Sequence, residues 1–229
     1  MENTQNHIAL TVNRLTYRYR TRGTTQNAVD NVSYLFEYGK VYAIIGKSGC
    51  GKTTLISNMA GLELPTTGDV LFEGTSTREM DRYNYRREKV AVIYQNYNLF
   101  PILTVMENVI YPMQLQNVSR REREKIAREK LESMGLGRSY WHRFPSMLSG
   151  GEQQRVAIAR ALASGQLILL ADEPTGNLDG ENSEAVMSTF KKLAHENNYC
   201  VIIVTHDPQV VEDSDVVIKM ESGKIVQDK

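Results

Sequence analysis

Val41-Tyr42-Ala43-Ile44-Ile45-Gly46-Lys47-Ser48-Gly49-Cys50-Gly51-Lys52-Thr53 joins an apolar run to a glycine-rich segment. Residues 41–45 have the pattern of a buried strand, and residues 46–53 match the P-loop pattern G-x-x-x-x-G-K-[ST]. Residues 52–60 suit a helix, which Gly61 is placed to end. Glycines let backbone N–H groups curl around phosphate oxygens, and a helix start directs its positive end at the same anion. The stretch therefore predicts a strand, loop and helix that together bind a nucleoside phosphate.

The side chains of this loop predict separate roles. Lys52 would supply a point charge to the terminal phosphates, and the Thr53 hydroxyl can ligate Mg²⁺. Cys50 is interpreted as a small filler residue, although a helix N-terminus can also lower the pKa of a thiol. The residues expected to hold the nucleotide at this loop are Gly46, Lys47, Ser48, Gly49, Cys50, Gly51, Lys52, Thr53 and Thr54.

Length and composition restrict the class of protein. The chain has 229 residues, enough for one large or two small domains. Its 27 Lys and Arg balance its 27 Asp and Glu, which argues against a nucleic-acid backbone as the main partner. Residues 1–7 lack the layout of a secretion signal, and the most apolar runs are far shorter than the ~20 residues that span a bilayer. Cys50 and Cys200 form no disulfide framework. We expect a soluble, intracellular chain.

Apolar periodicity predicts strands at both ends of the chain. Residues 8–12 alternate apolar with polar side chains, and 32–36 is another short apolar run. Buried-strand runs follow at 167–171 and 201–204, with a helical pattern at 184–196 between them. Strand, helix and strand in this order favour a parallel sheet.

The middle of the chain has a helical pattern. Ser119 and Glu122 match a capping box, and apolar residues then recur at helical spacing as far as Gly135. The six basic residues here alternate with acidic ones, so we interpret them as a solvated helical face rather than a nucleic-acid patch. They are Arg120, Arg121, Arg123, Lys125, Arg128 and Lys130.

The apolar run at 167–171 ends in two carboxylates, Asp172 and Glu173. Because successive strand residues point to opposite sides of a sheet, Asp172 and Glu173 cannot have the same role in the site. Asp172 suits a contact to Mg²⁺, and Glu173 suits a general base that polarises an attacking water. An isolated Asp-Glu is commonly a solvated strand end, but a P-loop lysine 120 residues earlier (172 − 52) strengthens the functional interpretation.

Two further polar residues follow apolar runs. His206 comes after the run at 201–204, which should lie beside the Asp172 strand, so a γ-phosphate contact is plausible for it. Gln95 ends the run at 92–94, and its amide could reach Mg²⁺ or the attacking water. Each is a weak signal alone, since such residues are usually structural or exposed. The other histidines are interpreted as surface residues.

A second glycine-rich segment lies between the P-loop and the acidic pair, at Leu148-Ser149-Gly150-Gly151-Glu152-Gln153-Gln154-Arg155. With it, the motifs resemble those of the ATP-binding-cassette (ABC) ATPases over essentially the full chain. Six elements occur in that family's order: Walker A at Gly46–Thr53, the Q-loop Gln95, the signature at Leu148–Arg155, Walker B ending at Asp172 with Glu173, the D-loop at Asn177–Asp179, and the switch histidine His206.

The resemblance implies the fold and its division. We expect the α/β ABC-ATPase fold of the P-loop NTPases, with a RecA-like parallel-sheet core, an antiparallel β subdomain and an inserted α-helical subdomain. Residues 1–229 would form one domain. Its catalytic core with the β subdomain would span approximately 1–95 and 166–229, and the helical subdomain carrying the signature approximately 96–165.

The resemblance also implies ligands and a dimer. In this family Ser149, Gly150 and Gly151 would contact the γ-phosphate held by the opposite subunit, and Asp179 would couple the two sites. Tyr19, or alternatively Tyr17, would stack on adenine, although either could be a strand-face residue. The implied ligands are ATP and Mg²⁺, held by Thr53, Gln95 and Asp172. The implied catalytic residues are Glu173, His206, Gln95 and Lys52, acting within a homodimer joined by ATP.

Finer resemblance lies in Asp172–Asp179, with Tyr94 and Gln95, which look like ATPases of the lipoprotein-release, macrolide-export and cell-division group. This implies a cytoplasmic ATPase, peripheral on the inner face of the membrane, that drives an export or mechanotransmission permease and needs no nucleic acid. The alternatives are a soluble ABC ATPase acting on DNA or ribosomes and a nucleotide-dependent regulatory module. Residues 96–106 are either core of the helical subdomain or an exposed permease-docking patch, with equal weight.

Overall fold

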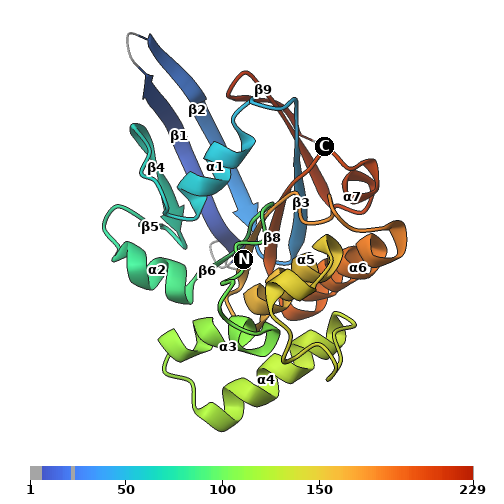
Figure 1. Ribbon diagram of the computed structural model, residues 1–229. Coiled ribbons are helices and arrows are strands. Elements are labelled where there is room, and N and C mark those ends of the chain that lie inside the picture. The colour runs from blue at the N-terminus through green and yellow to red at the C-terminus, as the bar shows by residue number, and fades with distance from the viewer. Residues whose placement is uncertain (1–6, 22–23, 229) are drawn as a thin grey trace.

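The computed structural model of the protein describes residues 7–21 and 24–228. Two sheets organise it, one four-stranded in the order β2-β1-β4-β5 and one six-stranded in the order β10-β9-β3-β8-β7-β6 (Figure 1). The strands are β1 (Ile8–Thr21), β2 (Thr24–Glu37), β3 (Lys40–Ile45), β4 (Thr67–Phe72), β5 (Thr75–Ser76), β6 (Val90–Ile93), β7 (Ile168–Asp172), β8 (Cys200–Val204), β9 (Val216–Glu221) and β10 (Lys224–Asp228). The helices are α1 (Lys52–Met59), α2 (Arg82–Glu88), α3 (Val105–Leu115), α4 (Arg120–Ser133), α5 (Gly150–Ala163), α6 (Gly180–Asn197) and α7 (Pro208–Glu212), with a 3₁₀ turn at Pro145–Met147.

The six-stranded sheet is parallel from β6 to β9, and β10 adds one antiparallel strand at its edge. β7 lies beside β8 in a register that pairs Asp172 with Val204, which confirms the predicted neighbourhood of these two strands. Every residue of both strands is buried, because the sheet is covered on its two faces. Asp172 and Val204, which lies two residues before His206, therefore end adjacent strands at one edge.

The two faces of this sheet support different layers. Side chains of β8 alternate between them: Val201 and Ile203 pack with the helices, whereas Ile202 packs with α1 and the antiparallel strands. In Figure 1 the helices α3 to α6 lie together on one side, and β1 and β2 extend from the other. Between β6 and β7 the chain forms only helices, turns and loops.

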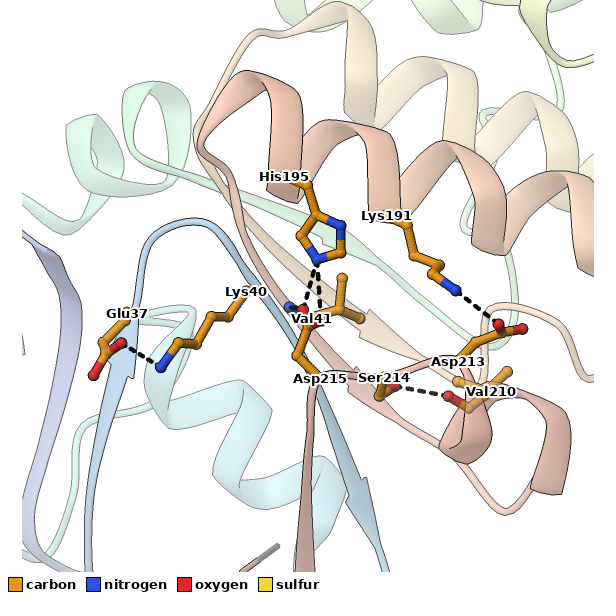
Figure 2. A network of polar contacts seen from close by, with 9 residues as sticks. All are labelled: Glu37, Lys40, Val41, Lys191, His195, Val210, Asp213, Ser214 and Asp215. Atoms are coloured by element: carbon orange, nitrogen blue, oxygen red, sulfur yellow. Dashed lines mark hydrogen bonds and ion pairs between the residues drawn. The ribbon is translucent and has the colours of Figure 1, made fainter.

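Asp215 ties the far end of α6 to the start of β3 (Figure 2). One of its carboxylate oxygens, Oδ2, accepts the backbone N–H of Val41 at 2.7 Å and lies 2.9 Å from Nε2 of His195. Nearby, the Lys191 ammonium donates to Asp213 at 2.9 Å. His195 is exposed, as its interpretation as a surface residue predicts, and it also anchors α6 against the strand that leads into the P-loop.

Two local predictions are adjusted by the structure. Leu167 is left outside its strand and exposed, because β7 begins at Ile168. Ser119 caps α4 by accepting the N–H of Glu122 at 3.3 Å, but the Glu122 carboxylate does not accept the N–H of Ser119, so only half of the predicted capping box forms. Over residues 7–21 and 24–228, no helix has both the length and the apolar character that crossing a bilayer requires.

Candidate nucleotide-binding site

The carboxyl ends of β3, β7 and β8 open into a cavity of about 620 Å³. It contains most residues that the motifs predicted, although they come from segments up to 187 residues apart (206 − 19). Its lining includes Tyr19, Gly46, Ser48, Gly49, Gly51, Lys52, Thr53, Thr54, Gln95, Asp172, Glu173 and His206. Lys47 and Cys50 do not line it, and neither do Ser149, Gly150, Gly151 and Asp179.

Glycine is required at two positions of the P-loop. A Cβ on Gly51 would lie 2.0 Å from the carbonyl oxygen of Ala28, and its φ of +106° is left-handed. A Cβ on Gly46 would lie 2.3 Å from the carbonyl oxygen of Met220. The loop is thus packed against β2 and β9 by its backbone alone, and no wider side chain fits there.

The start of α1 is suited to an anion. Its N-cap, Gly51, offers no side chain to cap the first N–H groups. Lys52 is largely buried, and its ammonium donates to the carbonyl oxygens of Gly46 at 2.7 Å and Lys47 at 3.1 Å. The loop therefore curls around a positive charge at a helix N-terminus, an arrangement that fits phosphate groups.

Cys50 lies beneath the loop rather than in the cavity. Its side chain is 8% exposed, and its sulfur is 4.0 Å from Nζ of Lys52. A Cβ on Gly46 would approach that same sulfur to 2.7 Å. Cys50 thus packs the underside of the loop, as a filler residue would.

Asp172 is suited to a cation. Burial raises the pKa of its carboxyl, while a hydrogen bond from Thr53 acts in the opposite direction. A divalent ion would favour the charged form, and a hydroxyl, an amide and a carboxylate from Thr53, Gln95 and Asp172 match the oxygen preference of Mg²⁺. Among the described residues, no three His, Cys, Asp or Glu side chains cluster as a metal site. Phosphate and water oxygens would therefore have to complete the ion's shell.

Glu173 and His206 form a contact at the rim of the cavity. Oε1 of Glu173 lies 2.7 Å from Nδ1 of His206, and this hydrogen bond is the main cause that raises the pKa of His206. The Glu173 side chain is 13% exposed and that of His206 77% exposed. Strand alternation was expected to separate Asp172 from Glu173. Instead Glu173 follows the strand with a left-handed φ of +51°, while its N–H still donates to Val204.

Of the two tyrosines expected near adenine, only Tyr19 lines the cavity. Its hydroxyl lies 3.2 Å from that of Thr54, which places the ring beside the start of α1. Tyr17 contacts Tyr19 edge-on at 5.0 Å between ring centroids. A hydrogen bond with Glu63 raises the pKa of Tyr17 to about 12 and engages its hydroxyl away from the cavity.

The signature segment lines a different cavity, of about 450 Å³. Ser149 caps α5 in a box with Glu152: its hydroxyl accepts the N–H of Glu152, whose carboxylate accepts the N–H of Ser149. Asp179 caps α6 by accepting the N–H of Asn182 at 2.9 Å. The two cavities share no lining residue. Within one chain the signature therefore does not face the P-loop.

Sequence reasoning missed some residues of the nucleotide cavity. Gln26, Ala28 and Val204 line it, and the carbonyl of Ala28 packs against Gly51. Thr205 is fully buried, and its hydroxyl accepts the N–H of Asp207 at 2.9 Å beside the Glu173 carboxylate. No motif marks Gln26 and Ala28, because their contacts depend on how β2 crosses the loop.

Comparisons with known proteins agree with this geometry. A profile described as ABC transporter matches residues 29–176. An uncharacterized ABC transporter ATP-binding protein of Mycobacterium tuberculosis is 39% identical over 218 residues, covering 94% of this chain and 88% of that one. The methionine import ATP-binding protein MetN of Staphylococcus saprophyticus is 37% identical over 94% of this chain and 64% of its own length.

Solved structures give the same result. The dimeric structure of MJ0796, a bacterial ABC transporter cassette, matches with a TM-score of 0.92 at 35% identity, covering 96% of this chain and 97% of that one. A post-hydrolysis state of that cassette, bound to ADP and Pi, matches equally well. These findings confirm the expected fold class and the expected ATPase. The chain therefore belongs to the ABC transporter family, as one of its ATP-hydrolysing cassettes.

Proposed function

We propose that this chain is the ATPase subunit of a membrane transporter, working as a head-to-tail homodimer that drives a permease. One observation carries the proposal: Lys52, Asp172 and the Glu173–His206 pair share one cavity, whereas the signature lines another. A chain built this way needs a second copy to bring Ser149, Gly150 and Gly151 to its nucleotide. The dimeric state of MJ0796, at 35% identity, supports the same arrangement.

The proposed chemistry assigns a role to each side chain. The ammonium of Lys52 offsets charge on the terminal phosphates, and backbone N–H groups of the loop orient them. Bound Mg²⁺ would add charge stabilisation, held from the protein side by Thr53, Gln95 and Asp172. Glu173 would accept a proton from the attacking water, and His206, 2.7 Å away, would hold that carboxylate in place. Tyr19 would stack on adenine, and Asp179 would join the two sites across the dimer.

A membrane partner is supported by a groove of about 570 Å³ between α2, β6, α3 and α5. We call it the docking groove; its apolar wall includes Tyr83, Phe100, Tyr111 and Leu115. Phe100 packs on Tyr111 with ring centroids 4.8 Å apart, yet it is 40% exposed. Ile102 beside it is 82% exposed, whereas Leu99 packs on the core. An apolar surface of this kind suits a short helix of a permease.

The direction of transport is a finer part of the proposal. The Asp172–Asp179 segment favours the lipoprotein-release, macrolide-export and cell-division group, and hence export or mechanotransmission from a position on the inner face of the membrane. The methionine import protein of S. saprophyticus is also similar, at 37% identity, and weighs toward import. Cargo selection would belong to the permease, because the site described here concerns nucleotide, metal and dimer contacts.

Size-exclusion chromatography of Glu173→Gln with and without ATP·Mg²⁺ tests the site. We expect an ATP-dependent dimer that persists only in the variant, with hydrolysis lost. Glu184→Gln, on the exposed side of α6, is the control with the same charge change and should behave as wild type. If Glu173→Gln stays a monomer under all conditions and still hydrolyses ATP, then Glu173 is not the general base and the site composed of two copies is not supported.

Membrane association separates a transporter subunit from a soluble ABC ATPase or a regulatory module. Phe100→Asp should release the chain from solubilised membranes that contain its permease, while its basal hydrolysis is unchanged. Leu35→Asp replaces an exposed apolar residue on β2 and should leave association intact. Retained association of Phe100→Asp would reject the docking groove.

A further inference from the structure

A second concave surface lies on the other side of α3. The cavity between α3, α4 and residues 138–142 has a volume of about 770 Å³, larger than the nucleotide cavity. Four arginines line it, three from α4 and one from the segment after that helix. We call this surface the arginine cleft; its arginines are Arg120, Arg123, Arg128 and Arg138.

The carboxylates of the cleft do not balance its arginines. Glu124 is shared by Arg120 at 3.0 Å and Arg128 at 3.4 Å. Glu107 caps α3, where it accepts the N–H and the hydroxyl of Thr104, each at 2.8 Å. Among the residues that the structure describes, Arg123 and Arg138 form no ion pair. The cleft therefore offers positive charge to an outside anion although the whole chain has no net charge.

The base of the cleft is apolar. Met106 and Ile110 of α3 contribute to it, together with Trp141. The indole N–H of Trp141 donates to the carbonyl of Leu136 at 3.1 Å, and the guanidinium of Arg128 lies 5.6 Å from the ring centroid. Cations around an apolar base suit a partner that presents carboxylates next to apolar side chains.

One helix separates this cleft from the docking groove. Tyr111 and Leu115 of α3 face the groove, whereas Ile110 and Gln114 face the cleft. Because a helix with its side chains is about 10–12 Å across, a single partner can reach both surfaces.

We propose that the arginine cleft is a second docking site, which holds an acidic cytoplasmic segment of the same permease that occupies the docking groove. This inference rests on the proposed function, since it assumes that a permease docks beside α3. The attraction is electrostatic and adds to the apolar contact in the groove. An anionic lipid headgroup is the competing ligand, but the apolar base formed by Met106, Ile110 and Trp141 favours a peptide segment.

Photocrosslinking in membranes that contain the assembled transporter tests the proposal. p-Benzoylphenylalanine is placed at Gln114 in the cleft and, separately, at Tyr83 in the groove, and the linked peptides are sequenced. We expect both positions to link to the same integral-membrane chain, and the peptide linked from Gln114 to contain neighbouring Asp or Glu residues. Raising the salt from about 50 mM to about 500 mM should weaken the Gln114 product and spare the Tyr83 product.

Charge reversal gives the matched comparison. Arg123→Glu with Arg138→Glu should lower the Gln114 product by about tenfold or more, because like charges then face each other. Arg121→Glu with Lys125→Glu changes the charge equally on a surface of α4 outside the cleft, and should leave both products unchanged. Basal ATP hydrolysis of the isolated chain should be the same in all variants, which reports that each is folded.

Several outcomes would overturn the proposal. A Gln114 product made only with lipid would assign the cleft to a headgroup, and a linked peptide without carboxylates would remove the electrostatic argument. An equal loss of the Gln114 product in both double variants would show that the general charge of the chain, rather than the arginines of the cleft, attracts the segment. Failure at Gln114 alone would leave the proposed function intact, whereas failure to link any membrane chain from Tyr83 as well would reject the proposed function itself.

Discussion

Two helix starts in this molecule carry glycine-rich motifs, and they are built differently. The first turn of α1 follows Gly51, which has no side chain to cap it. The first turn of α5 follows Ser149, whose hydroxyl accepts one N–H of that turn and whose own N–H bonds the Glu152 carboxylate. Lys52 adds a positive charge to the start of α1, whereas Glu152 adds a negative charge to the start of α5.

This contrast indicates different roles for the starts of α1 and α5 in binding the nucleotide. A helix start without a side-chain cap, beside an ammonium group, can hold phosphates by itself. A start that is already capped and carries a carboxylate gains little from an anion that arrives alone. We infer that α1 provides the primary binding and that α5 contributes only to a nucleotide already held by another copy.

The largest effect is expected at the α1 end. Lys52→Ala should slow ATP hydrolysis by about 10²–10³-fold, because the charge facing the terminal phosphates is lost. Lys47→Ala removes the same charge from an exposed loop position outside the cavity and should lower the rate little. Steady-state phosphate release measures both. Equal losses would show that general charge, rather than the position of Lys52, holds the nucleotide.

Alkylation probes the underside of the same loop. A maleimide on the sulfur of Cys50 should inactivate the enzyme, because that sulfur packs against Gly46 and lies 4.0 Å from the Lys52 ammonium. Bound ATP should slow the labelling. Cys50→Ala should hydrolyse ATP and resist the reagent, since Cys200 is fully buried. Labelling at the same rate with and without ATP would contradict this prediction.

At the α5 end the expected losses are smaller. Ser149→Ala should lower the free energy of unfolding by about 1 kcal/mol through loss of the cap, and weaken the ATP-dependent dimer of Glu173→Gln. Thermal unfolding and analytical ultracentrifugation measure the two effects. Ser139→Ala, at an exposed serine that caps no helix, is the control. A variant with normal stability would show that the box with Glu152 does not hold α5.

Glu152→Gln tests whether the negative charge at the start of α5 weakens the binding of a nucleotide held by another copy. It keeps an oxygen that can accept the N–H of Ser149 but removes the negative charge from the first turn of α5. The ATP-dependent dimer of Glu173→Gln should therefore tighten by about two- to fivefold. A weaker dimer would mean that the carboxylate itself is needed across the interface, and the inferred contrast between α1 and α5 would fail.

The smallest effect is expected at the Glu173–His206 contact. Because the pKa of His206 is raised, its pairing adds stability at pH values below the unfolded pKa of about 6.5, and this stability is lost as the pH rises through the folded pKa. Nuclear magnetic resonance should show His206 of the wild type titrating above that of Glu173→Gln. Identical titration curves would mean that the contact does not persist in solution.

The sequence by itself identified each motif and most of the side chains around the nucleotide, because strand, loop and helix starts follow from local pattern. It also indicated that the strands before Asp172 and His206 would lie side by side, since two buried apolar runs joined by a helix favour adjacent parallel strands. The tertiary structure decided the contacts that cross between layers. Ala28 reaches Gly51 only through the packing of β2, and Glu173 leaves its strand through a left-handed turn rather than by alternation.

The same limit applies to the charged residues. Local pattern predicted a helix with a solvated face between Ser119 and Gly135, and α4 (Arg120–Ser133) lies there, but only the packing of α3, α4 and Trp141 gathers three of its arginines into a cleft. Likewise, the signature is visible in the sequence, while its separation from the P-loop appears only in the folded chain. Periodicity and turn chemistry act over a few residues, whereas these arrangements depend on which buried faces pack together far along the chain.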